Sequence, residues 1–218
     1  MSTFKTQAIV LSKRSFIEDD RFYTLYTKSH GKLEVLVKAA AKTSSKLAGH
    51  LEPFTCVEVM IARGRNRETL AGVRIIEFYK FNNLADLSLA NLASETINKM
   101  IKQGVPDQEV FNLFLKLLPF LAGSSKLEIK KLAVMRFLWQ LIRLSGYSIS
   151  AERNGDFIAS LPKLSAAAKK TFALLTVLAS TSFKTSTTVL KELENYTKNY
   201  LEYILESELK SLNLLAYA

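Results

Sequence analysis

Two short clusters of basic residues are the strongest chemical feature of the sequence. One, residues 38–46 (KAAAKTSSK), places three lysines among small and hydroxyl side chains, and the other, residues 63–67 (RGRNR), places three arginines around a glycine. Small neighbours let a polyanion approach the backbone, and guanidinium groups bind phosphate with two hydrogen bonds at once. Taken alone, either cluster is equally consistent with a solvated loop. Taken together, they predict phosphate contacts by Lys38, Lys42, Lys46, Arg63, Arg65 and Arg67.

The net charge also favours a polyanionic partner. The 218 residues carry a net charge of +10, and the pI is near 9.6. Residues 1–80 hold 14 Lys and Arg against 8 Asp and Glu, so the positive charge is denser in this part. Such an excess attracts nucleic acid, acidic membranes or acidic proteins at long range. We expect Lys13, Arg14 and Arg21 to extend the positive surface.

Residues for catalysis or metal binding are scarce. His30, His50 and Cys56 are the only histidines and cysteine, too few for a closed Cys/His zinc site within the chain. No glycine-rich phosphate-binding motif is present. Cys56 lies in an alternating apolar segment, which favours a buried thiol over a nucleophile paired with His50. The acidic run 18–20 (EDD) is interpreted as a solvated loop, because adjacent side chains of an extended segment point to opposite faces. The prediction is a protein with no catalytic residue, no metal and no cofactor.

Membrane and export signals are also missing from the sequence. No stretch approaches the ~20 apolar residues that span a bilayer. The first residues lack the basic and apolar regions of a secretory signal. One cysteine cannot form an internal disulfide, which fits a reducing compartment. We therefore expect a cytoplasmic protein.

The first eighty residues predict five short strands. β-Branched and aromatic residues alternate with polar ones in residues 7–11, 21–27, 32–37, 55–61 and 69–75, with turn residues between them. A helical turn is expected within the stretch 42–51. Five short strands favour a closed or partly open barrel, since closure removes exposed sheet edges. Both basic clusters then lie on loops at the barrel's edge, as in small oligonucleotide-binding barrels.

From about Leu84 the apolar period becomes helical. Helices are expected over 84–104, over 107–121, over 127–145, from Ser165 onward, and from Val189 to Leu209, with a loop over 148–164. Pro119 should kink or end the second helix. The third is apolar nearly all round, which predicts a buried hub. Strands followed by helices indicate an α+β protein, with a β-barrel in residues 1–80 and an all-helical domain in residues 81–218.

An ordered series of short segments resembles the bacterial RecO family of recombination mediators. The segments are residues 7–11 (QAIVL), 20–27 (DRFYTLYT), 30–32 (HGK), 38–42 (KAAAK), 45–47 (SKL) and 49–54 (GHLEPF), and more loosely 137–146 and 201–211. The resemblance implies an N-terminal OB-fold and a C-terminal helical domain. It implies no enzymatic activity but binding of single- and double-stranded DNA, annealing of complementary strands, DNA repair, and association with the nucleoid. It also implies partnership with RecR, with the C-terminal tail of single-strand-binding protein, and with the RecA pathway.

Two departures from the family pattern affect these expectations. Many relatives carry a four-cysteine zinc site after the central helix, whereas residues 147–170 contain no cysteine here. We therefore expect the zinc finger to be absent. The family's usual glycine after Lys38 is Ala39, and Lys42 stands where arginine is common. These changes retain the charge but call into question the turn geometry and a bidentate phosphate contact.

Two other functions fit the same residues. A small basic barrel does not by itself choose DNA over RNA, so an RNA-binding OB protein is the first alternative. The second is an adaptor whose helical domain binds an acidic, aromatic peptide tail, such as that of single-strand-binding protein. Its candidate partner-binding residues are Lys126, Lys130, Lys131, Arg136 and Arg143, for which a solvated helix face is the competing interpretation.

Overall fold

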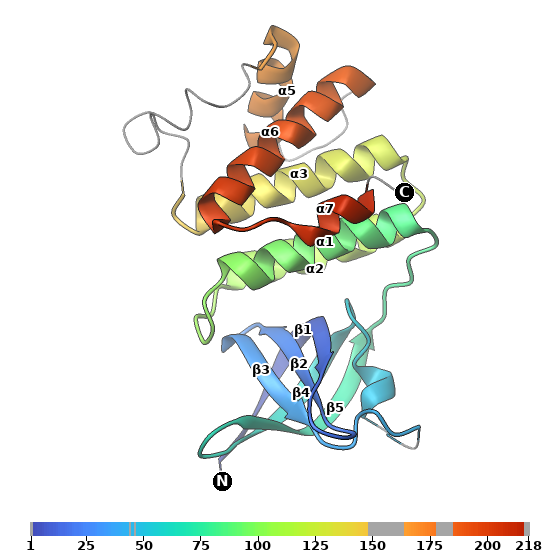
Figure 1. The fold of residues 1–218 in the computed structure, drawn as a ribbon, viewed down its shortest axis with the longest axis vertical. Coiled ribbons are helices and arrows are strands. Elements are labelled where there is room, and N and C mark those ends of the chain that lie inside the picture. Colours follow the sequence, from blue (N-terminus) through green and yellow to red (C-terminus); the bar gives the residue numbers. More distant parts are fainter. Residues whose placement is uncertain (1, 44, 46, 148–163, 178–184, 216–218) are drawn as a thin grey trace. The chain divides into compact units, whose positions relative to one another are not determined.

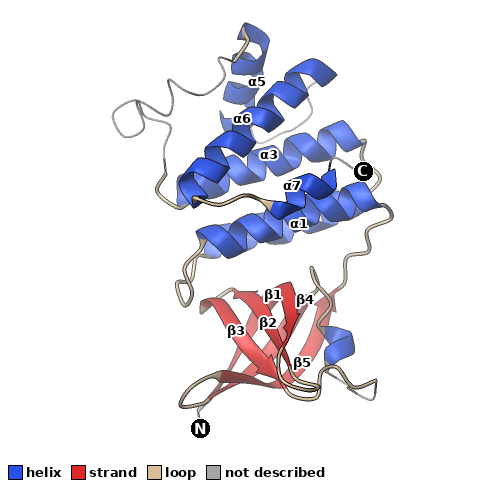
Figure 2. Cartoon of the chain, viewed as in Figure 1, coloured by secondary structure: helices blue, strands red, loops and turns tan. Residues whose placement is uncertain are grey.

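The computed structural model describes residues 2–43, 45, 47–147, 164–177 and 185–215 (Figure 1). Strands occupy the first part of the chain and helices the rest (Figure 2). The strands are β1 (Thr3–Ser15), β2 (Arg21–Thr27), β3 (Gly31–Val37), β4 (Cys56–Arg63) and β5 (Glu68–Glu77), and they close into a barrel in the order β1-β2-β3-β5-β4. The predicted helical turn is the 3-10 helix η1 (Ala48–His50).

The barrel closes around the alternate residues of its strands. Val10, Leu25, Val35 and Val59 are each 0% exposed and belong to one apolar core. Successive side chains of a strand point to opposite faces, so the neighbours of these residues lie on the outer face, where Ile9, Tyr26 and Leu36 are also buried. This core fixes the register of the strands and so the position of every loop at the barrel's edge.

The seam between β3 and β5 is short and parallel, and it pairs only Val35 with Glu68 and Leu36 with Thr69. The remaining edge of β3 is covered by residues 103–105. Gln103 forms a parallel bridge with Lys32, and the Gly104 N–H donates to the Lys32 carbonyl (2.9 Å). Gly31 has φ +67°, and a Cβ there would lie 2.2 Å from the Val105 carbonyl oxygen. Only glycine therefore allows this close approach.

Six helices are described: α1 (Leu84–Met100), α2 (Gln108–Ala122), α3 (Leu127–Leu144), α5 (Ala166–Val177), α6 (Thr187–Leu205) and α7 (Lys210–Leu215). The predicted caps of α2 and α5 are confirmed. Asp107 Oδ1 accepts from the Glu109 and Val110 N–H groups (2.9 and 3.0 Å), and Ser165 Oγ accepts from the Ala168 N–H (3.2 Å). The hub prediction for α3 is also confirmed, since its apolar residues are largely buried and it packs against α1, α5 and α6.

Two of the predicted helices end earlier than expected, and Pro119 does not end the second helix. The first helix stops at Met100 rather than at Gly104, whereas the second contains Pro119 and runs to Ala122, which costs one N–H bond in its last turn. The last helix does not run to Leu209. It ends at Leu205, where Glu206 takes the left-handed conformation (φ 49°), and α7 begins anew at Lys210.

The chain forms two compact units, and each unit is built from two separate stretches of the sequence. The barrel unit contains residues 1–80 and 101–119, and the helical unit contains residues 81–100 and 120–218. Within the barrel unit, Phe111 of α2 is buried and faces the ring of Tyr26 (centroids 6.3 Å apart). The predicted boundary at residue 80 coincides with the first crossing between units, and the division into two domains stays a prediction.

Candidate nucleic-acid interface

One edge of the barrel carries both predicted basic clusters. We call it the basic rim and define it as the turn 38–42, the loop 16–20 and the hairpin 63–67. The loop 16–20 joins β1 to β2, the turn follows β3, and the hairpin joins β4 to β5. Gly64 closes the hairpin by donating to the Arg67 carbonyl (3.1 Å), and a Cβ at Gly64 would lie 2.5 Å from that oxygen.

The loop 16–20 contacts both basic clusters. Asp20 Oδ1 accepts from the Ala39 N–H (2.8 Å), and the Asp19 carbonyl accepts from the Ala41 N–H (2.7 Å). On the other side of the same loop, the Arg67 guanidinium lies over the ring of Phe16 (5.4 Å to the centroid). The acidic run thus lies in a largely exposed loop between two strands, as predicted, and this loop in addition holds the turn 38–42 and contacts the hairpin.

Ala39 occupies the position where the resemblance to the RecO family implies glycine. Its φ is +52°, a left-handed conformation that costs a residue with a Cβ roughly 1–2 kcal/mol. The hydrogen bond to Asp20 and the Lys42 N–H bond to the Ala39 carbonyl (3.2 Å) hold the turn in this conformation. The turn is thus formed without its glycine.

The cationic side chains of the basic rim differ in their exposure and in the partners that they contact. Lys38 is exposed and has no hydrogen bond or ion pair to another described residue. Lys42 pairs with Asp19 at 3.5 Å while its side chain stays 55% exposed. Arg63 lies over the ring of Phe4 (4.9 Å to the centroid), and Arg65 is exposed. Lys46 lies outside the described residues.

Three further candidate residues are ion-paired or partly buried, so they are less accessible to phosphate than the sequence suggests. Lys13 forms an ion pair with Glu52 (2.8 Å), and Arg14 forms one with Glu34 (2.8 Å). Arg21 is half-buried at the start of β2. An exposed ion pair is worth little, so a phosphate can displace the carboxylate at Lys13 or Arg14, at the cost of breaking that pair.

A groove lies beside the hairpin, with a volume of about 650 Å³. Its walls combine arginines, carboxylates and two phenylalanines: Arg14, Phe16, Phe22, Glu34, Arg63, Arg67 and Glu68, with Gln103 at the covered edge of β3. The two aromatic rings meet edge to face (4.6 Å, 67°), and Arg14 lies over Phe22 (4.3 Å). Sequence reasoning missed both phenylalanines, although a phenylalanine two residues after the basic pair 13–14 was the available signal.

The cationic residues of α3 do not form one surface. Lys130 is buried and pairs with Asp86 at 2.8 Å, with both side chains 4% exposed. A role for Lys130 in binding a partner is therefore wrong as predicted, because its charge is satisfied inside the helical unit. Lys131 pairs with Glu194 (3.0 Å), Arg136 is half-buried, and only Lys126 and Arg143 are exposed at the two ends of the helix.

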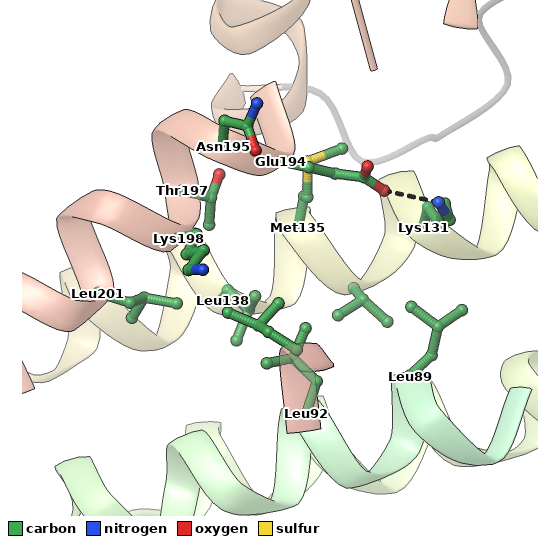
Figure 3. A pocket seen from close by; sticks show the side chains of 12 residues that line it. Leu89, Leu92, Lys131, Met135, Leu138, Glu194, Asn195, Thr197, Lys198 and Leu201 are labelled. Carbon is green, nitrogen blue, oxygen red and sulfur yellow. Dashed lines mark ion pairs between the residues drawn. The ribbon is translucent and has the colours of Figure 1, made fainter. Parts of the chain in front are cut away.

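A separate pocket of about 310 Å³ lies within the helical unit, between α1, α3, α6 and α7 (Figure 3). Leu89, Leu92 and Leu138 form an apolar part, while Lys131, in its ion pair with Glu194, and Lys198 supply charge (Figure 3). Trp139 of α3 packs against α6: its Nε1–H donates to Thr197 Oγ1 (3.0 Å), and its ring stacks on Tyr200 (centroids 5.2 Å apart).

Cys56 is buried and accepts a hydrogen bond from Gln7 Nε2 (3.3 Å). Burial raises the pKa of the Cys56 thiol, which keeps it protonated and unreactive. In the part of the chain that the structure describes, no three His, Cys, Asp or Glu residues gather as metal ligands. Within the same part, no helix has the length and apolarity needed to cross a bilayer.

A closed five-stranded barrel with a basic rim, followed by helices, defines an α+β protein of the OB-fold type. The N-terminal model of recombination protein O matches residues 1–79, and the C-terminal model of the same family matches residues 82–157. The chain belongs to the RecO family.

Curated relatives agree with this assignment. A protein of Thermoanaerobacter sp. named DNA repair protein RecO is 33% identical over 150 residues, which cover 67% of this chain and 59% of the relative. A relative of the same name from Pelotomaculum thermopropionicum is 28% identical over 70% of this chain and 59% of its own. One from Dehalococcoides mccartyi is 34% identical over 66% of this chain and 56% of its own. The matched region thus spans less than two thirds of these relatives.

Proposed function

We propose that the chain binds single- and double-stranded DNA through the basic rim and anneals complementary strands. In recombinational repair it acts, together with RecR, as a mediator that assists the loading of RecA. The names of the relatives and the family assignment support a repair role. The observation that carries DNA binding is the convergence of the turn 38–42 and the hairpin 63–67 on one loop.

The proposed mechanism is electrostatic and makes or breaks no covalent bond. Two DNA strands repel each other through their phosphates, and lysines and arginines that contact the phosphates release bound counterions and screen this repulsion. Exposed Lys38 and half-exposed Lys42 are the cations best placed to do so. Base pairing between the two strands then supplies the driving force.

A salt titration of binding to a single-stranded oligomer tests the proposal. The logarithm of affinity should fall linearly with the logarithm of salt concentration, and Lys38→Glu plus Lys42→Glu should reduce the slope by about 1.4 or more. The same double variant should lose strand annealing. Lys28→Glu plus Lys116→Glu changes the charge of the barrel unit equally at exposed positions outside the rim, and it should retain most of the activity. A flat salt dependence, or equal annealing by both double variants, would remove the rim from the mechanism.

A second candidate function uses the pocket of the helical unit. Its apolar wall and Lys198 suit an acidic, aromatic peptide such as the C-terminal tail of single-strand-binding protein. A labelled peptide of that chemistry should bind the full chain, and Lys198→Glu should weaken binding, whereas Lys170→Glu at an exposed position of α5 should not. Competition between matched DNA and RNA oligomers separates DNA binding from the RNA-binding alternative.

A further inference from the structure

The groove beside the hairpin 63–67 is not a simple path for phosphates. Arg14 donates from both Nε and Nη2 to Glu34 Oε1 (3.0 and 2.8 Å), so part of its charge is already neutralised. Glu68 adds a second carboxylate to the same walls. A backbone of phosphates would meet both carboxylates there, whereas the turn 38–42 with exposed Lys38 offers a more positive route.

The groove also contains a surface on which a planar group can stack. Phe16 is 36% exposed, and its ring meets the Phe22 ring edge to face (4.6 Å between centroids). The Arg67 guanidinium lies 5.4 Å from the centre of the Phe16 ring. Stacking of a base on an aromatic ring is typical of proteins that bind single strands.

Glu68 supplies a hydrogen-bond acceptor that is still open. It is half-buried at the start of β5, and its carboxylate has no hydrogen bond or ion pair to another residue in the described part of the chain. Yet three arginines line the same groove. A half-buried carboxylate without a partner is unfavourable, so a ligand that donates hydrogen bonds to it gains affinity.

Among the four DNA bases, guanine matches this combination of groups. Its N1–H and N2–H donors lie side by side and fit both oxygens of one carboxylate, and its O6 and N7 acceptors suit an arginine. Thymine presents a single N–H between two carbonyl oxygens, which repel a carboxylate. Adenine and cytosine offer one amino donor beside a ring acceptor. Paired guanine has its donors occupied, so only an unpaired base fits.

We propose that the groove binds one unpaired guanine of a single strand, stacked on Phe16, with its N1–H and N2–H donating to Glu68 and its O6 and N7 facing Arg63 or Arg67. This inference rests on the proposed DNA-binding function and names the base that the groove selects. The phosphates of the same strand follow the exposed cations of the rim.

The test compares five labelled 13-residue single strands by fluorescence anisotropy with the full chain. Each is oligo-thymidine whose central position is guanine, adenine, cytosine, thymine or an abasic site; one guanine per strand avoids guanine quadruplexes. The guanine strand should bind roughly five- to thirty-fold more tightly than the thymine strand, the ratio that about 1–2 kcal/mol gives. Glu68→Gln should abolish this preference without weakening binding of the thymine strand. Phe16→Ala should reduce binding of every strand except the abasic one.

Glu109→Gln is the matched control, because it removes one exposed carboxylate from the barrel unit outside the groove. It should keep the guanine preference. Equal affinity of the wild-type protein for all five strands would overturn the base site while leaving DNA binding intact. A guanine preference that survives Glu68→Gln would overturn the assignment of Glu68. Failure of every strand to bind would overturn the proposed function and the base site together.

Discussion

Replacing Asp20 with alanine should weaken DNA binding although it removes a negative charge from the basic rim. Coulombic reasoning alone gives the opposite sign, since a carboxylate about 10 Å from a phosphate repels it by about 0.4 kcal/mol in water. The structure gives Asp20 a different role. Its Oδ1 accepts the Ala39 N–H (2.8 Å) and so holds the turn that carries Lys38 and Lys42.

The size of the effect follows from that hydrogen bond. A hydrogen bond to a charged group contributes about 1.5–3 kcal/mol, and without it Ala39 retains the cost of its left-handed conformation. If DNA binding must restore the turn, this energy is the upper limit of the loss in affinity. The Asp19 carbonyl still accepts from Ala41, so we expect a loss of about three- to tenfold, which corresponds to about 0.7–1.4 kcal/mol.

The affinity of Asp20→Ala and of the wild-type protein for a single-stranded oligomer, measured by fluorescence anisotropy at a fixed salt concentration, tests this prediction. Asp20→Asn is the matched variant, because its side-chain oxygen can still accept from Ala39 while the charge is gone, and it should bind at least as tightly as wild type. Glu18→Gln removes a neighbouring charge from an exposed position and should behave like Asp20→Asn. If Asp20→Ala also binds as tightly as wild type, the turn does not depend on Asp20 and the reasoning fails.

Two further predictions concern the helical unit. Lys130→Met should lower the free energy of unfolding by about 3–5 kcal/mol, because it leaves Asp86 buried without its cation, and adding Asp86→Leu should recover much of this loss. Urea unfolding followed by Trp139 fluorescence measures the stability of both variants. A single variant as stable as wild type would contradict a stabilising role for the ion pair. Burial would raise the pKa of Glu95, but hydrogen bonds from Ser211, Lys210 and Lys99 lower this pKa below its ordinary value of 4.5. The stability that Glu95 contributes is therefore present above pH 4.5 and is lost as the pH falls through the lower pKa of the folded state. Glu95→Gln should therefore cost about 1.5–3 kcal/mol at pH 7 and progressively less below pH 4.5 in the same unfolding assay, and a pH-independent difference would exclude this linkage.

Alternation and helical periodicity predicted the elements well, because burial of one face imposes those periods directly. The five strands, the caps by Asp107 and Ser165, and the buried α3 all follow from local patterns of this kind. The basic clusters were likewise visible as composition. Their convergence was not, because it depends on the register of the barrel and on hydrogen bonds between residues 19–20 and 39–41.

The failures have physical causes of the same non-local kind. Lys130 resembles any other lysine on a helix, and only the fold shows Asp86 placed beside it. The break after Leu205 is stabilised by Glu95, whose carboxylate accepts the N–H groups of Lys210 and Ser211 at the start of α7. Phe16 and Phe22 became a stacking surface only once β1 and β2 had paired. Each case needs a partner distant in sequence.

The cover that residues 103–105 place on β3 has a consequence for dissecting the protein. A fragment that stops at residue 80 would leave Lys32 and its neighbours with bare backbone groups, ready to recruit a strand from another molecule. The smallest fragment that keeps the barrel intact must bring back the segment 101–119 from beyond α1. Splicing residue 80 to residue 101 through a short glycine and serine tether, with α1 deleted, is thus a sounder excision than truncation.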